Sequence, residues 1–382
     1  MKIFKIRNDY AGYIDLLKHL QGSSRVVFAL EHWTHRLVDF LAAQGYSGFY
    51  VNPNAMPSYR SRYKSASVKS DELDAFILAD LLRTDRHNLT EIILDTPFVR
   101  ELKGLIVDRK HYVRDETRLV NRLEGCLVEY YPEALKFFDN PASKVALEFW
   151  AAYPTLDDTR GLTVEDVESF LAAHKWYRGR DEVAKRIIKI VSGETIKVLN
   201  DVVRVKSRML LGIVEQLKLL KKTIADYNQE IKRLVESKED AGQYTSLPGA
   251  GSTLGPAIYT LFSGGIKFDR LVEIRAYVGT APVTSQSGVF RGVSFRFACN
   301  HFYRNVFQRL AFCSLKESQW AMGYYRGKRR EGKKHQHALR CLADLWVKVA
   351  YAMWRKKERY DEQKHLASMA QFWLSNNSRM KA

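Results

Sequence analysis

The sequence has little cysteine and no long apolar run. Its 382 residues hold four cysteines, Cys126, Cys299, Cys313 and Cys341. They are too scattered for a Cys-x-x-Cys metal pair and too few for a disulfide framework in a chain of this length. No stretch of about 18 apolar residues occurs, and the N-terminus lacks the apolar core of a signal peptide. These absences argue against membrane-spanning and disulfide-stapled proteins and predict a protein of the reducing cytoplasm.

Negative charge is also in short supply. The chain has 61 Lys and Arg against 43 Asp and Glu, a formal net charge of +18, and 46% of its residues are hydrophobic. This hydrophobic content excludes a chain that is mainly a disordered basic tail, so the positive charge lies on the surface of folded domains. Such a surface attracts polyanions through backbone phosphates and counterion release. Nucleic acid is therefore favoured as the partner over an anionic membrane.

The first region, residues 1–95, has the pattern of a parallel α/β unit. Residues 26–30 and 46–51 are short apolar runs, typical of strands buried on both faces, and residues 35–44 between them have helical spacing. Strand, helix and strand in this order indicate a parallel pair. A helix over 70–83 and a possible strand over 91–95 follow.

The second and third regions, residues 96–240 and 241–382, are expected to be mostly helical. Apolar residues from Leu210 to Leu234 alternate spacings of three and four, which is typical of a coiled-coil seam. We expect this seam to pair with another helix, and favour a helix of a second subunit. The alternative is one long amphipathic helix packed on its own chain.

Acidic residues gather in the first region. Asp71 and Asp74 are three apart, which places both carboxylates on one face of a helix, where they could share Mg²⁺. The alternative is ordinary capping, with Ser70 as N-cap and acids in the first turn. Glu31 ends an apolar run, at the carboxyl end of a strand where open α/β sheets bind ligands. A surface glutamate is the competing interpretation there.

The third region offers a glycine turn and a serine. Gly249 and Gly251 lie in a turn that feeds a helix, whose free N–H groups could hold a phosphate, although a purely structural turn is the alternative. Ser285 and Ser287 precede a run of arginines and aromatic residues. A serine amid positive charge suggests a nucleophile for a phosphodiester, but no Ser/His/Asp spacing supports it and the composition is common in loops.

Cations and aromatic rings are interleaved in several segments. Basic side chains neutralise backbone phosphates, and aromatic rings stack on exposed bases. Residues 326–335 carry six positive charges and one negative charge, part of which is expected to be solvated surface. The candidate nucleic-acid contacts are Lys69, Arg109, Arg114, Arg118, Arg122, Gly249, Gly251, Arg291, Arg296, Arg304, Arg329 and Lys333.

Taken together, these segments resemble insertion-sequence transposases of the DEDD type, a group whose relatives use a structured bridge RNA to pair donor and target DNA. The resemblance covers nearly the whole chain. It implies an α/β plus all-α fold: a ribonuclease-H-like (RuvC-like) N-terminal domain, long coiled-coil helices and a mostly helical C-terminal transposase domain. The motifs that carry it are Leu30-Glu31, Asn52-Pro53, Ser70-Asp71 with Asp74-Ala75, residues 247–251, Ala281-Pro282 with Ser287-Gly288, and residues 296–300.

The resemblance also implies roles for individual residues. Glu31, Asp71 and Asp74 correspond to the second, third and fourth acids, which bind Mg²⁺, and Ser287 corresponds to the nucleophilic serine, with Ser285 in reserve. The serine attacks the scissile phosphate, and a 3′-hydroxyl later reverses the covalent link, so that no ATP is needed. The expected partners are DNA, a structured guide RNA and further copies in a homodimer or homotetramer, in the bacterial cytoplasm.

One departure from the family concerns its first acid, which lies on an opening hairpin. This chain begins with a segment similar to the one that follows that hairpin, and neither Asp9 nor Asp15 lies on a credible first strand. We therefore expect a metal site short of one ligand, through a start placed too late or a decayed element, and weak or no activity. Two other hypotheses stay open: a metal-dependent junction nuclease that does not need Ser287, and a non-catalytic DNA- or RNA-binding remnant.

Overall fold

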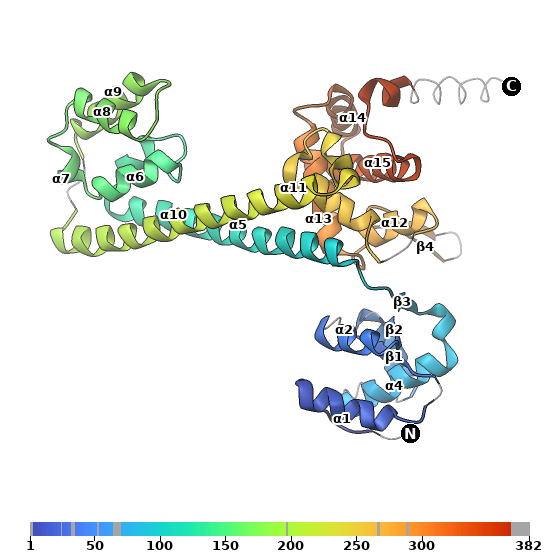
Figure 1. The fold of residues 1–382 in the computed structure, drawn as a ribbon. Coiled ribbons are helices and arrows are strands. Elements are labelled where there is room, and N and C mark those ends of the chain that lie inside the picture. Colours follow the sequence, from blue (N-terminus) through green and yellow to red (C-terminus); the bar gives the residue numbers. More distant parts are fainter. Residues whose placement is uncertain are drawn as a thin grey trace. The chain divides into compact units, whose positions relative to one another are not determined.

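The protein is mostly helical and carries two small sheets (Figure 1). The computed structural model describes residues 3–367 except 24, 32–34, 52, 64–69, 196–197, 266–267 and 288–289, and the backbone alone at 35, 54, 285, 290 and 291. These residues form two compact units, one made of residues 1–102 and 238–382 and the other of residues 103–237. No helix among the described residues is long and apolar enough to cross a bilayer.

The N-terminal part contains a three-stranded sheet in the order β1–β2–β3. β1 and β2 pair in parallel and β3 joins β2 in the antiparallel direction. The predicted strand, helix and strand are therefore confirmed, and the possible third strand is present. The elements are α1 (Tyr10–Leu20), β1 (Val27–Leu30), α2 (His35–Ala43), β2 (Ser47–Tyr50), η1 (Pro53–Ala55), α3 (Met56–Ser61), α4 (Asp71–Thr84), η2 (Arg86–Asn88) and β3 (Thr90–Ile92).

α4 packs on β1, and this packing fixes the position of the first turn of α4. Ile77 and Leu81 of α4 are buried together with Val51 and Met56. The helix begins where the sequence predicts, since the Ser70 side chain accepts a hydrogen bond from the backbone N–H of Leu73 at 3.2 Å. This packing holds the carboxylates of the first two turns of α4 in place relative to the end of β1.

The second unit is built on two long helices, α5 (Pro97–Tyr130) and α10 (Asn200–Glu236), which lie side by side (Figure 1). The two helices run antiparallel. Lys221 of α10 lies 2.6 Å from Glu116 of α5, and six residues later in α10 the ring of Tyr227 lies 5.3 Å from the ring of Tyr112, which comes before Glu116 in α5. The other elements are η3 (Pro132–Lys136), α6 (Lys144–Ala152), α7 (Leu156–Thr159), α8 (Val164–Ala173) and α9 (Arg180–Val191).

The predicted seam of α10 is largely buried within its own unit. Leu210, Ile213 and Leu217 are at most 3% exposed and belong to a core with residues of α5, α6, α8 and α9. A helical seam needs an apolar partner surface, and here helices of the same chain provide it. The within-chain alternative is thus what the described residues show, while pairing between subunits stays a prediction.

The C-terminal part is mostly helical, as expected, with one hairpin. Its elements are η4 (Glu239–Ser246), α11 (Gly251–Phe262), α12 (Leu271–Val278), β4 (Val283–Ser287), β5 (Phe290–Ser294), α13 (His301–Ser314), α14 (Gln319–Arg330) and α15 (His335–Lys356). α13 packs on α15, where Trp346 is fully buried and its indole N–H donates to the Ser314 hydroxyl at 2.9 Å. The hairpin differs from the loop that its serine-rich composition indicates: Ser285 and Ser287 lie on a strand, because residues 283–287 pair with residues 290–294.

Candidate functional site

Two of the three predicted acids lie together at the carboxyl end of β1. Glu31 directly follows β1, and Asp74 lies in the first turns of α4, the helix that packs on that strand. Their side chains are only 21% and 13% exposed. The Oε1 atom of Glu31 is buried and has no hydrogen-bond partner among the described residues. Such an orphaned carboxylate oxygen is costly unless a cation or a donor can reach it.

A cation that the sequence did not predict lies between these acids. Arg60, on α3, donates from Nε and Nη2 to the two carboxylate oxygens of Asp74, both at 2.6 Å. Its Nη2 also lies 3.9 Å from Glu31 Oε1. The hydrogen bond to Asp74 raises the pKa of the guanidinium, so it stays charged. Nothing in the sequence distinguishes Arg60 from the other basic residues of the chain.

The acid pair fits a divalent metal ion. Both side chains present carboxylate oxygens, the ligands that Mg²⁺ prefers along with water, and the orphaned oxygen of Glu31 faces a position where a cation already lies. Asp71 begins α4 and is exposed. No three His, Cys, Asp or Glu side chains among the described residues are close enough to share one ion. Of the three predicted ligands, Glu31 and Asp74 are thus the two that lie together and would be available to a metal ion, while Asp71 is exposed.

Ser287 is exposed at the end of the hairpin strand β4, opposite Phe290 of β5. A nucleophile that attacks DNA must be open to solvent, and Ser287 meets this requirement. Ser285 lies two residues earlier on the same strand, so the pleat places its Cα on the same side. The side chains of Ser285 and Arg291, and all of Gly288, lie outside the described residues.

The base of the hairpin is braced by arginines. Arg296 donates to the Ala281 carbonyl at 3.1 Å. Arg304 is 7% exposed, donates to the Arg296 carbonyl and lies 4.5 Å from the ring of Phe295. The guanidinium of Arg340 lies 4.9 Å from that ring. The sequence predicts that Arg304 contacts nucleic acid, but its burial against backbone carbonyls gives it a structural role in the hairpin instead.

The glycine turn is also packed for structure. The N–H of Gly249 donates to a carboxylate oxygen of Glu317 at 2.7 Å, so an acidic group holds the position expected for a phosphate. Gly249 has φ +75°, and a Cβ there would lie 2.6 Å from the backbone carbon of Cys313. This contact supports the structural alternative for Gly249. Gly251, at φ +52°, opens α11 and has open space where a Cβ would lie.

The two glycines give a matched test of this packing. Gly249→Ala is expected to lower the free energy of unfolding by about 2–4 kcal/mol, because left-handed strain adds to a collision with α13. Gly251→Ala should lower it by only about 1 kcal/mol, because it carries the strain alone. Denaturant unfolding of both variants measures the difference. Equal losses would contradict the packing role of Gly249.

Three predicted arginines form an exposed row on α5. Arg114, Arg118 and Arg122 are spaced by four residues and are all exposed, so they share one face of the helix. Arg109 instead donates a hydrogen bond to the Asn228 side chain of α10. Lys69 lies outside the described residues. The row is therefore the part of the predicted α5 interface that the structure leaves open to solvent.

Part of the positive charge of the basic segment at the end of α14 is neutralised by an acidic residue of the same segment. Glu331 lies 2.8 Å from both Lys328 and Lys333, and hydrogen bonds from these two lysines lower the pKa of its carboxyl to about 2. Arg329 is exposed and donates to the Lys333 carbonyl at 2.6 Å. The remaining cations of this segment give it a net positive surface.

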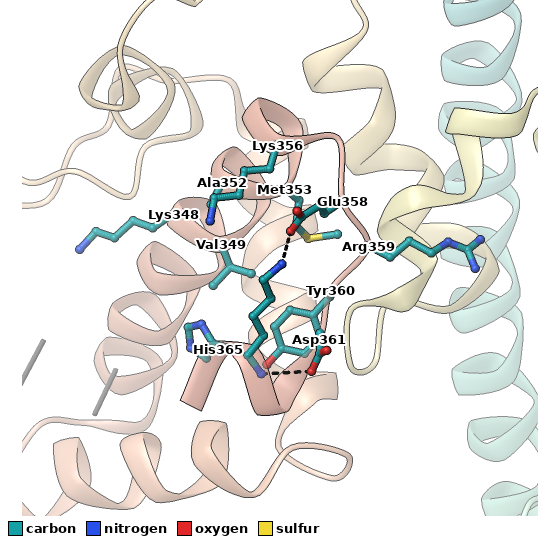
Figure 2. A pocket seen from close by; sticks show the side chains of 11 residues that line it. Lys348, Val349, Ala352, Met353, Lys356, Glu358, Arg359, Tyr360, Asp361 and His365 are labelled. Atoms are coloured by element: carbon teal, nitrogen blue, oxygen red, sulfur yellow. Dashed lines mark hydrogen bonds and ion pairs between the residues drawn. The ribbon is translucent and has the colours of Figure 1, made fainter. Parts of the chain in front are cut away.

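A further hollow lies at the end of α15 (Figure 2). Val349 and Met353 line it together with charged residues, among them Lys364. Lys364 Nζ is 2.7 Å from Glu358, and the Lys364 N–H donates to Asp361 at 3.1 Å. Lys364 and Glu358 pair with each other within the lining, and the geometry assigns no ligand to this hollow.

Comparison with known proteins now defines the class. A family model described as Transposase, of the DEDD and IS110 type, matches residues 1–132, and a model described as Transposase IS116/IS110/IS902 family matches residues 243–326. The chain is a DNA transposase, an enzyme class whose DEDD type typically uses a divalent metal ion. It belongs to the IS116/IS110/IS902 family of insertion-element transposases.

Relatives align along most of the chain. A protein named for the IS117 mini-circle of Streptomyces coelicolor is 27% identical, with 96% of this chain and 91% of the relative covered. The 44.8 kDa protein of insertion element IS116 of Streptomyces clavuligerus is 26% identical over 93% and 89% of the two chains. The transposase for insertion sequence element IS1111A of Coxiella burnetii is 21% identical over 77% and 69%.

Proposed function

We propose that this transposase exchanges DNA strands through a covalent serine–DNA intermediate, with Mg²⁺ as its metal and a structured RNA as its guide. The observation that carries the proposal is the exposure of Ser287 at the end of a strand whose hairpin is braced at its base by Arg296 and Arg304. A nucleophile must be reachable by the phosphate and held in a defined direction. Ser287 is exposed, and the pairing of its position with Phe290 fixes the course of its backbone.

The chemistry of the proposed step balances without an external energy source. The Ser287 oxygen forms a bond to phosphorus as the bond from phosphorus to the 3′ oxygen breaks, and the departing oxygen takes up a proton. The 3′-hydroxyl of another strand then attacks the serine-linked phosphate and releases the serine. Each step exchanges one phosphodiester for another, so the bond energy is kept.

Glu31 and Asp74 support the metal part of the proposal. They lie at the carboxyl end of β1 in a parallel pair covered by α4, an arrangement compatible with a ribonuclease-H-like, RuvC-like domain. They would hold Mg²⁺, with Asp71 at the exposed edge. A bound ion would supply charge stabilisation for the phosphate as its oxygens gain charge.

The exposed arginine row of α5 and the segment around Arg329 support nucleic acid as the partner. Arginines contact backbone phosphates without reading sequence. They would therefore hold the DNA while a base-paired guide selects its sequence. We extend the proposal to a structured guide RNA and to action as a homodimer or homotetramer.

The proposed function is tested by reconstitution. The purified protein is mixed with Mg²⁺, donor DNA, target DNA and RNA transcribed from the noncoding DNA that flanks its gene. We expect recombined junctions in the complete mixture, at a low level that amplification across them still detects, and a loss of at least tenfold without the RNA. Equal recombination without RNA would refute guidance, and cleavage without any joining would favour a simple nuclease.

A further inference from the structure

The guanidinium of Arg60 lies where the proposed metal site needs a cation. One nitrogen, Nη2, is 2.6 Å from Asp74 Oδ2 and 3.9 Å from Glu31 Oε1, so a single positive group pairs with both acids. We propose that Arg60 is a positioning residue of this site: it holds Glu31 and Asp74 together as an internal cation and gives way when a divalent ion binds. This inference rests on the proposed metal-dependent function.

The charges explain why such a cation is needed before metal arrives. Two carboxylates that share a partly buried site repel each other, and burial penalises each charge further. The bidentate contact with Arg60 gives each oxygen of Asp74 a charged hydrogen-bond donor. Arg60 can therefore keep the two side chains in place without metal.

The geometry also explains why a metal ion can displace Arg60. The guanidinium satisfies both oxygens of Asp74 but leaves Glu31 Oε1 without a hydrogen bond. A hydrated Mg²⁺ is compact and carries its own waters as ligands and donors, so it can satisfy both carboxylates at once. Exchange would give up the two hydrogen bonds from Arg60 to Asp74 and its 3.9 Å approach to Glu31, and both carboxylates would hold the ion instead.

The attachment of Arg60 lets it leave without unfolding its surroundings. It lies near the end of the short helix α3, whose Met56 is buried in the core at 1% exposure. The Arg60 side chain is long and 16% exposed. Core packing through Met56 anchors the helix, while rotation about the bonds of the Arg60 side chain is enough to move the guanidinium toward solvent.

The test measures metal binding to the full-length protein without nucleic acid. Arg60→Gln removes the charge at similar size, and Arg60→Lys keeps the charge without the two-pronged contact. The matched control is Arg62→Gln, because Arg62 is 53% exposed and pairs with Asp85 at 3.4 Å, away from the acid pair. Calorimetric titration with Mg²⁺ or Mn²⁺ and thermal unfolding with and without chelator are the measurements.

We expect Arg60→Gln to bind the ion about tenfold more tightly than the unchanged protein. This factor corresponds to a site that the Arg60 side chain occupies about nine-tenths of the time, which leaves about one-tenth of the molecules ready to bind metal. Its melting temperature in chelator should fall and recover when metal is added. Arg60→Lys should show a smaller gain in affinity, and it replaces Arg60→Gln if that variant does not fold. Arg62→Gln should bind metal as the unchanged protein does.

The outcomes separate this inference from the function it rests on. Equal or weaker metal binding by the folded Arg60 variants, with binding by the unchanged protein intact, overturns the role of Arg60 alone. Absence of metal binding in the unchanged protein and in Arg60→Gln overturns both the inference and the proposed metal site. Tighter binding in Arg62→Gln as well would assign the effect to net charge and also overturn the inference.

Discussion

Replacing Ser287 by alanine is expected to abolish the covalent protein–DNA adduct and to lower strand exchange on the order of 10³-fold or more, because the attacking oxygen is gone. Ser287 is exposed at the end of β4, so the change should leave the fold intact. Adducts are measured by denaturing electrophoresis of protein trapped on labelled DNA. The same gel shows free cleaved strands, which a nuclease that does not use the serine would still produce.

Two further serines of the hairpin sharpen this experiment. Ser294→Ala is the matched control, because Ser294 is exposed on β5 and its position pairs with Val283 at the other end of the hairpin. It should keep activity within about twofold. Ser285→Ala tests the reserve nucleophile. Adducts that persist in Ser287→Ala and vanish in Ser285→Ala would move the chemistry to Ser285.

Replacing Glu31 by glutamine is expected to lower metal-dependent strand cleavage on the order of 10³-fold, the size of effect when one electrostatic group of a phosphate-activating site is lost. The substitution keeps the shape of the side chain and leaves the Arg60–Asp74 pair in place. Single-turnover cleavage at several Mg²⁺ concentrations measures the loss. Glu31→Gln should also weaken metal binding in calorimetry, which separates a ligand from a residue that only contacts DNA.

The matched control for Glu31 is Glu91→Gln. Glu91 lies on β3 of the same sheet and is exposed, opposite Phe49. It should cleave as the unchanged protein does. Glu31→Gln with cleavage and metal affinity both within threefold of the unchanged protein would rule out the acid pair as the metal site.

The parts of the fold that follow from local pattern were predicted from the sequence. The apolar runs around β1 and β2 and the capping serine of α4 are local signals, and they placed Glu31 and Asp74 correctly on their elements. The pairing of those two acids in space follows from α4 packing on β1, which a parallel α/β pattern implies. The exposure of Asp71 depends on the rotation of the helix and was not predicted.

The parts that depend on distant contacts were not predicted. Arg60 meets Asp74 and Glu31 across 14 and 29 residues, and a basic chain offers too many equivalent candidates. The burial of Arg304 likewise depends on the path of residues 295–297 around it. A heptad pattern shows that α10 needs an apolar partner but not which helix supplies it. The serines of β4 are typical of loops, but the pairing of this strand with β5 overrides that local preference.

The most direct measurement is the identity of the residue that carries DNA after reaction. The protein is incubated with Mg²⁺, guide RNA and DNA, the trapped adduct is digested with protease and nuclease, and the nucleotide-bearing peptide is sequenced by mass spectrometry. The account predicts a phosphate linkage on Ser287, which the Ser287→Ala variant lacks. A linkage at a tyrosine or another side chain, or recombined product formed with no linked peptide at all, would contradict it.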